Sequence, residues 1–264
     1  MGRVIVLTSG KGGVGKSTST ANLGTALAMA GKKVVVVDAD VGLRNLDIIM
    51  GLESRVVYTS MDVLEGTCEL NRALVIDRRV ENLKLLAASQ KNNKTDIQPE
   101  QMEKICTELK AEYDYVLIDS PAGIEQGFQN AAAGADEALI ITTPEVSAVR
   151  DADRIIGLLQ SKGIKTMYLV INRLSPKMVK NGDMMSQQDV IDILAIELIG
   201  VIPEDAEIVV STNRGMPLTH NQGSAAGEAF KRVAQRLEGD PVPIPEFQTE
   251  NWFGQMVGKL FKGA

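Results

Sequence analysis

Short apolar runs that alternate with helical patterns constrain the fold of this 264-residue chain most strongly. Several of these runs, such as residues 4–7 and 116–118, are apolar at consecutive positions, which is typical of strands buried on both faces of a parallel sheet. Because strands and helices alternate, we predict an α/β fold with a single doubly wound, mostly parallel sheet and helices on both faces. The predicted strands are residues 4–8, 33–38, 83–87, 115–119, 137–142, 166–172 and 198–202, and the predicted helices are residues 17–30, 99–111, 125–133, 147–161, 186–195 and 224–237.

Charge and cysteine content narrow the classes of function. The net charge of −6 argues weakly against a general nucleic-acid binder, although it leaves room for a local basic patch. The two cysteines, Cys68 and Cys106, fit no metal or redox spacing, so we expect buried free thiols in a reducing cytosol. No apolar run reaches the roughly 20 residues that a membrane span requires, and the first residues show no signal-like pattern. We therefore expect a cytoplasmic protein.

A glycine-rich loop follows the first predicted strand and reads Gly-Lys-Gly-Gly-Val-Gly-Lys-Ser from Gly10 to Ser17. It matches both the dinucleotide pattern G-x-G-x-x-G and the P-loop pattern G-x-x-x-x-G-K-[ST]. The lysine and the hydroxyl favour the P-loop, in which Lys16 contacts the β- and γ-phosphates of ATP and Ser17 holds Mg²⁺. Glycines allow backbone amides to surround the phosphates, and the following helix presents its positive end. The predicted phosphate-binding residues are Gly10, Gly12, Gly13, Val14, Gly15, Lys16, Ser17 and Thr18.

Lys11 is a second cation in this loop, and one subunit does not need it to bind ATP. The simpler interpretation is a solvated lysine. The functional interpretation is that Lys11 reaches a phosphate held by another subunit, as arginine fingers do in trans. The sequence by itself leaves both interpretations open.

Three aspartates stand at or just beyond the ends of predicted strands. Asp38 ends one strand, and ligands of open α/β sheets bind at that carboxyl edge. Asp40 lies two residues further on. Asp119 ends an apolar strand in the Walker B arrangement, which predicts a place near Mg²⁺. Such aspartates can also be ordinary caps or turn residues, but three of them beside a P-loop favour the nucleotide site.

Lys11 to Thr18, placed after a strand, resembles the deviant Walker A box of the MinD/ParA family of dimerising ATPases. The resemblance runs from residue 1 to the final tail and is closest in segments 38–47, 119–123 and 145–154. It implies that Asp40 orients the attacking water. The catalytic residues that it implies are therefore Asp40 and the two lysines of the loop, Lys11 and Lys16. It also implies that Ser17, Asp38 and Asp119 support Mg²⁺.

The same resemblance points to the part of the site that holds the base. It implies that Asn172, at the end of a predicted strand, contacts adenine. The loop after the last predicted strand, with Pro203 and Asp205, is expected to wall the same pocket. In such ATPases the region of Asp151 and Asp153 lies near a partner surface, although a charged run is more often plain solvated surface.

The last residues form a second strong pattern. On a helical wheel over residues 252–262, one half is apolar and the other half carries Gln255, Gly258, Lys259 and Lys262. This separation is typical of a helix that lies in an anionic membrane surface, although a C-terminal helix docked on its own domain would look the same. A stretch with three prolines precedes it, so we predict an ATPase domain over residues 1–238, a linker over 239–250 and a membrane-targeting helix over 251–264. The apolar residues are Trp252, Phe253, Met256, Val257, Leu260 and Phe261.

The energetics of this tail suggest why dimerisation would matter. Six partly buried apolar side chains, at ~1.5–3 kcal/mol each, must exceed an ordering cost of ~1 kcal/mol or more for each of about ten residues. One tail therefore binds marginally. Two tails on one dimer raise the avidity by roughly 10²-fold or more.

The resemblance implies a slow, switch-like ATPase that uses ATP and Mg²⁺ and positions the division site of a cell or plastid. As an ATP-dependent homodimer it would cycle onto the inner face of the membrane, recruit a MinC-like division inhibitor and respond to a MinE-like activator. No specific nucleic acid is expected. One alternative is a ParA-like DNA-segregation ATPase, which the charge of −6 and the tail disfavour. Another is a metabolic enzyme or electron carrier on the same fold, which would need cluster-binding cysteines that neither Cys68 nor Cys106 provides.

Overall fold

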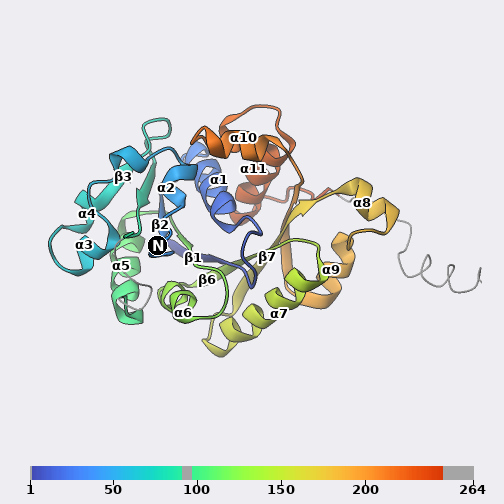
Figure 1. Cartoon of the computed structure of the whole chain (residues 1–264), viewed down its shortest axis with the longest axis horizontal. Helices are drawn as coiled ribbons and strands as arrows, with labels where there is room; N and C mark the ends of the chain where they lie inside the picture. Colours follow the sequence, from blue (N-terminus) through green and yellow to red (C-terminus); the bar gives the residue numbers. More distant parts are fainter. Residues whose placement is uncertain (1, 91–96, 246–264) are drawn as a thin grey trace, which may run out of the picture.

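A mostly parallel sheet runs through the centre of the structure, a computed structural model that describes residues 2–90 and 97–245 (Figure 1). The eight strands found in these residues lie in the order β3-β4-β2-β5-β1-β6-β7-β8, and only the β3–β4 pair is antiparallel. Their bounds are β1 Arg3–Thr8, β2 Val34–Asp38, β3 Leu74–Ile76, β4 Leu83–Leu86, β5 Tyr115–Asp119, β6 Glu137–Thr142, β7 Thr166–Leu174 and β8 Glu197–Pro203.

Helices cover both faces of this sheet, and each face has its own apolar core. Helices α1 and α11 pack on one face, and α5, α6, α7 and α9 pack on the other (Figure 1). The bounds are α1 Lys16–Met29, α2 Leu46–Ile49, η1 Glu53–Arg55, α3 Ser60–Leu64, α4 Leu70–Ala73, α5 Pro99–Glu112, α6 Gln126–Ala133, α7 Val146–Ser161, α8 Pro176–Asn181, α9 Gln187–Leu194, α10 Glu207–Asn213, η2 Leu218–His220 and α11 Ala225–Leu237.

The strand order reverses at β1: β5, β2 and β4 lie on one side of it, and β6 to β8 extend the sheet on the other. In doubly wound sheets such a reversal leaves a crevice at the carboxyl ends of the strands, and ligands bind there. Asp38 and Asp119 are register partners at the ends of β2 and β5, so both carboxylates lie on this edge.

The fold class predicted from the sequence is confirmed, together with all seven predicted strands and all six predicted helices. The boundaries differ by up to two residues. One difference matters for the site: Pro203 is the last residue of β8, whereas the sequence placed it in a loop after the strand. The short elements β3, α2, α3, α4, α8 and α10 were not predicted, because each of these helices spans fewer than two turns and β3 has only three residues.

Two local features of the structure bear on the sequence analysis. Ser186 caps α9, since its hydroxyl accepts a hydrogen bond from the Asp189 amide. Cys68 and Cys106 are both buried free thiols. The expected C-terminal helix over residues 251–264 lies outside the described residues, so it stays a prediction. In the described part of the chain, no helix combines the length and apolar character needed to cross a bilayer.

Candidate nucleotide site

The glycine-rich loop joins β1 to α1 and turns through backbone conformations that favour glycine. Gly13 has φ +79° and Gly15 has φ +94°, and Gly15 occupies the position just before α1. A side chain on Gly15 would also lie 2.3 Å from the amide nitrogen of Asn172, and one on Gly10 would lie 2.3 Å from the carbonyl oxygen of Asp151. The loop is therefore held tightly between the end of β7 and the first turns of α7.

The first turn of α1 faces the end of β5. Lys16 is only 8% exposed, and its positive charge opposes the rise in the pKa of Asp119 that burial causes. The Thr20 hydroxyl donates a hydrogen bond to the Asp119 carboxylate, with 3.2 Å between Oγ1 and Oδ1, and the nearby Ser17 hydroxyl also acts to lower the pKa of Asp119. A buried lysine, two hydroxyls and a carboxylate thus meet at the start of one helix.

Asp38 lies beside this group and is almost fully buried. Burial, together with repulsion by Asp119, raises the pKa of Asp38. Its two oxygens accept hydrogen bonds from the backbone amides of Asp40, at 2.9 Å, and Leu46, at 3.2 Å. Asp38 therefore fixes the path of the chain that carries the half-buried Asp40 out of the sheet edge.

The loop after β5 is attached to the end of β1 and to Ser9, the residue just before the glycine-rich loop. The amide of Ser120 donates to the carbonyl oxygen of Leu7, and the amide of Gly123 donates to that of Ser9. Gly123 has φ +89°, a conformation that a residue with a side chain rarely adopts. These two hydrogen bonds would transmit a movement at the start of the glycine-rich loop to residues 120–123.

Lys11 extends toward the start of α7. Its Nζ lies 3.2 Å from Glu145 Oε2 and 3.1 Å from Ser147 Oγ, and its side chain is 43% exposed. The sequence predicted a role for Lys11 but not these two contacts, since more than 130 residues separate the groups. The family resemblance of segment 145–154 pointed to this region, but it predicted no contact between this region and Lys11.

Asn172 lies under the glycine-rich loop, near the end of β7. Its Nδ2 donates to the carbonyl oxygen of Val14 at 2.7 Å, whereas its buried Oδ1 has no hydrogen-bond partner among the described residues. A buried carbonyl oxygen without a partner is costly and marks a place where a ligand donor fits. The following residue, Arg173, has φ +56°, which is uncommon outside glycine.

Asp205 is occupied by contacts within the fold. Its carboxylate accepts hydrogen bonds from the Glu207 amide, the Ser224 hydroxyl and the Ala226 amide, at 2.9, 2.9 and 3.3 Å. These bonds lower the pKa of Asp205 despite its partial burial. Asp205 thus joins the loop after β8 to the start of α11, a role that the sequence did not predict.

Comparison with known proteins places these features in a family. Residues 5–218 match the family described as the CobQ/CobB/MinD/ParA nucleotide binding domain. The chain is 55% identical over 248 residues to the septum site-determining protein MinD of Synechocystis, covering 94% of this chain and 93% of that protein.

Two solved structures are also similar. One is the MinC:MinD cell division protein complex of Aquifex aeolicus, with a TM-score of 0.87 and 50% identity over 94% of this chain and 100% of that one. The other is MinD from Pyrococcus horikoshii complexed with Mg-ADP, with a TM-score of 0.82 and 31% identity over 90% of this chain and 96% of that one. With its P-loop and paired strand-end aspartates, the chain belongs to the MinD septum site-determining proteins of the CobQ/CobB/MinD/ParA nucleotide-binding family.

Proposed function

We propose that this chain is a slow ATPase that dimerises on binding ATP and Mg²⁺, and that the dimer binds the inner face of the membrane to help position the division site. The observation that carries the proposal is the arrangement of two lysines on one loop. Lys16 is buried beside Asp119, whereas Lys11 lies on the outside, held by an exposed contact to Glu145. The first lysine suits a phosphate of its own subunit, and the second suits one across an interface.

The residues at the start of α1 fit a triphosphate with its metal ion. Backbone amides of the glycine-rich loop and the positive end of α1 would bind the phosphates, and Lys16 would neutralise their charge. The Ser17 hydroxyl and the Asp119 and Asp38 carboxylates are the hard oxygen donors that Mg²⁺ prefers. Bound there, the ion would offset charge on the transferred phosphoryl group.

We assign Asp40 to the attacking water rather than to the phosphates. Asp38 accepts a hydrogen bond from the Asp40 amide, which fixes the Asp40 backbone just beyond the sheet edge. A carboxylate in this place can orient a water molecule for attack on the γ-phosphate. Asp40 is therefore the residue to which we assign hydrolysis.

The unpartnered Oδ1 of Asn172 supports its assignment to the base. Adenine carries an exocyclic amino group that can donate a hydrogen bond to such an oxygen. Pro203 ends β8 close to Leu174, its register partner on β7, and is assigned to the wall of the same pocket. Asp205 would shape that wall through its bonds to α11 rather than by touching the base.

The membrane part of the proposal depends on the sequence of the tail, residues 252–262. Its apolar half would enter the lipid surface while Lys259 and Lys262 meet anionic headgroups. Dimerisation joins two tails, so ATP binding strengthens attachment and hydrolysis weakens it.

The similarity to the Aquifex MinC:MinD complex supports a MinC-like inhibitor as one partner. A MinE-like activator is the partner that would time release.

Vesicle sedimentation tests this proposal. The full chain and a chain truncated after Glu250 are each mixed with anionic lipid vesicles and ATP, ADP or no nucleotide. We expect only the full chain to pellet, and to pellet most strongly with ATP. If both chains pellet to the same extent, with or without nucleotide, the proposed membrane switch is wrong.

A further inference from the structure

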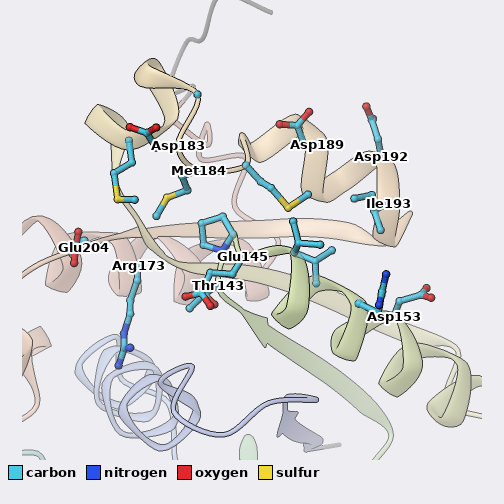
Figure 2. Close-up of a pocket in the computed structure, with 17 residues that line it drawn as sticks. Thr143, Glu145, Asp153, Arg173, Asp183, Met184, Asp189, Asp192, Ile193 and Glu204 are labelled. Atoms are coloured by element: carbon cyan, nitrogen blue, oxygen red, sulfur yellow. The ribbon is translucent and has the colours of Figure 1, made fainter. Parts of the chain in front are cut away.

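An apolar groove with an acidic rim lies between α7 and the α8–α9 segment (Figure 2). Its volume of about 1210 Å³ exceeds the roughly 300–1,000 Å³ that is typical of small-molecule sites. Three of its apolar side chains are well exposed: Val146 at 69%, Ile193 at 51% and Met178 at 40%. With Val149, Met184 and Met185 they make a methionine-rich lining of the kind that adapts to a helix laid into it.

Carboxylates outnumber cations around this lining by six to two. The two cations are Arg150 and Arg173. Figure 2 shows Asp189 and Asp192 on α9 across the groove from Asp153 on α7. Lys11 already pairs with Glu145, and Asp189 caps α9, but the rim as a whole stays acidic. An occupant should therefore be apolar on one side and cationic on the other. The six acids are Glu145, Asp153, Asp183, Asp189, Asp192 and Glu204.

The described chain ends beside the strand that α9 leads into. Arg236 of α11 donates hydrogen bonds to the carbonyl oxygens of Ile199 in β8 and of Val242 and Pro243 in the C-terminal stretch. Ile244 then packs against the same apolar core as Met184 and Met185, on the α7–α9 face of the sheet. The chain has thus crossed from the α11 face to the face that carries the groove.

The tail begins a short way along the chain from this end. The seven residues from 245 to 251 span at most roughly 23 Å when extended, and an 11-residue helix is roughly 16 Å long. The pattern of residues 252–262 also has the required character, with one apolar half and two lysines on the other. The place where the described chain ends, the apolar lining of the groove and its acidic rim therefore all favour residues 252–262 as the occupant.

We propose that residues 252–262 of this chain bind the α7–α9 groove of their own subunit when no membrane is present. The apolar half of the tail would lie on Val146, Ile193 and the methionines, and Lys259 and Lys262 would meet the acidic rim. The apolar half of the tail cannot contact the groove and the lipid at the same time. The groove therefore competes with the membrane, a consequence that rests on the proposed membrane role, and keeps single subunits in solution.

Trp252 provides the test, because it is the only tryptophan of the chain. The emission of the full chain is recorded without nucleotide and lipid and compared with that of a synthetic peptide of residues 246–264. We expect Trp252 of the full chain to emit at a shorter wavelength than Trp252 of the peptide. We also expect acrylamide to quench its emission less. Ile193→Lys should bring both readings close to those of the peptide and weaken docking roughly tenfold, since it removes apolar contact and adds like charge.

A matched control separates this effect from a general change of surface. Val57 is 78% exposed and lies outside the groove, so Val57→Lys should leave the Trp252 emission unchanged. In vesicle sedimentation without nucleotide, Ile193→Lys should raise the bound fraction several-fold, and Val57→Lys should not. Both variants change exposed residues and are expected to fold.

Two results would overturn the proposal. One is an emission of the full chain that equals that of the peptide. The other is a protected Trp252 whose emission depends on protein concentration and whose protein doubles in molar mass, because the tail would then sit on a second copy. If no variant binds vesicles, the proposed membrane role fails, while the lipid-free Trp252 emission still decides whether the tail docks.

Discussion

At the scale of residues, the two lysines of the glycine-rich loop have different surroundings. Lys16 is buried against a carboxylate, while Lys11 makes a half-exposed contact with Glu145 and Ser147. Exposed ion pairs contribute only about 0–1 kcal/mol, so little free energy holds Lys11 in this position. Lys11 can therefore leave Glu145 for a phosphate at small cost.

Asp40 gives a prediction at this scale. We expect Asp40→Ala to bind ATP as well as the unchanged chain, since the phosphate-binding groups are untouched, and to lose hydrolysis by about 10²-fold or more. Nucleotide affinity and phosphate release measure the two properties separately. Normal turnover in this variant would show that another residue orients the water.

Cys106 gives a second prediction, which concerns pH. Burial raises the pKa of its thiol to about 12, so the reactive thiolate is scarce even at pH 9. We expect native protein to resist alkylation at Cys106 between pH 7 and pH 9, and unfolded protein to react at both cysteines. Mass spectrometry of the labelled peptides measures this. Rapid labelling of Cys106 in the native state would mean that α5 opens away from the sheet.

The sequence was sufficient to place Lys16, Ser17, Asp38 and Asp119 near one another, because each follows or ends a predicted strand and parallel strands end at one edge. It was not sufficient for the contact of Lys11 with Glu145 or for the three hydrogen bonds that Asp205 accepts. These contacts depend on how helices pack across the edge. No local pattern encodes that packing.

At the scale of elements, glycines show how closely helices approach the sheet. A side chain on Gly24 of α1 would lie 2.6 Å from Val36 Cγ1 of β2, whereas one on Gly157 of α7 would meet nothing within 4 Å. The first glycine therefore permits close packing of α1, and the second only weakens its helix. The sequence predicted both helices but could not distinguish these two glycines.

The two positions give a matched pair of predictions. Gly24→Ala should destabilise the fold by about 1–3 kcal/mol through overpacking of the core. Gly157→Ala should stabilise it by about 0.5–1 kcal/mol, since alanine is the better helix former. Urea unfolding measures both changes. Equal effects of the two substitutions would contradict the packing of α1 described above.

At the scale of the whole molecule, the glycine-rich loop and the residue before it contact three other parts of the site. Gly10 and Lys11 touch α7, Val14 accepts a hydrogen bond from Asn172, and Ser9 accepts one from the loop after β5. Binding of a nucleotide at this loop would therefore affect several surfaces around the crevice together. This arrangement suits a switch between association states better than a site built to release a product.

The molar mass in solution with ATP tests this claim most directly. Asp40→Ala, which should keep its ATP, is compared with the double variant Asp40→Ala, Lys11→Ala by light scattering on a sizing column. We predict that the single variant doubles from the 28.4 kDa of one chain and that the double variant binds ATP but stays at 28.4 kDa. A double variant that dimerises as well as the single one would contradict the role of Lys11 across the interface.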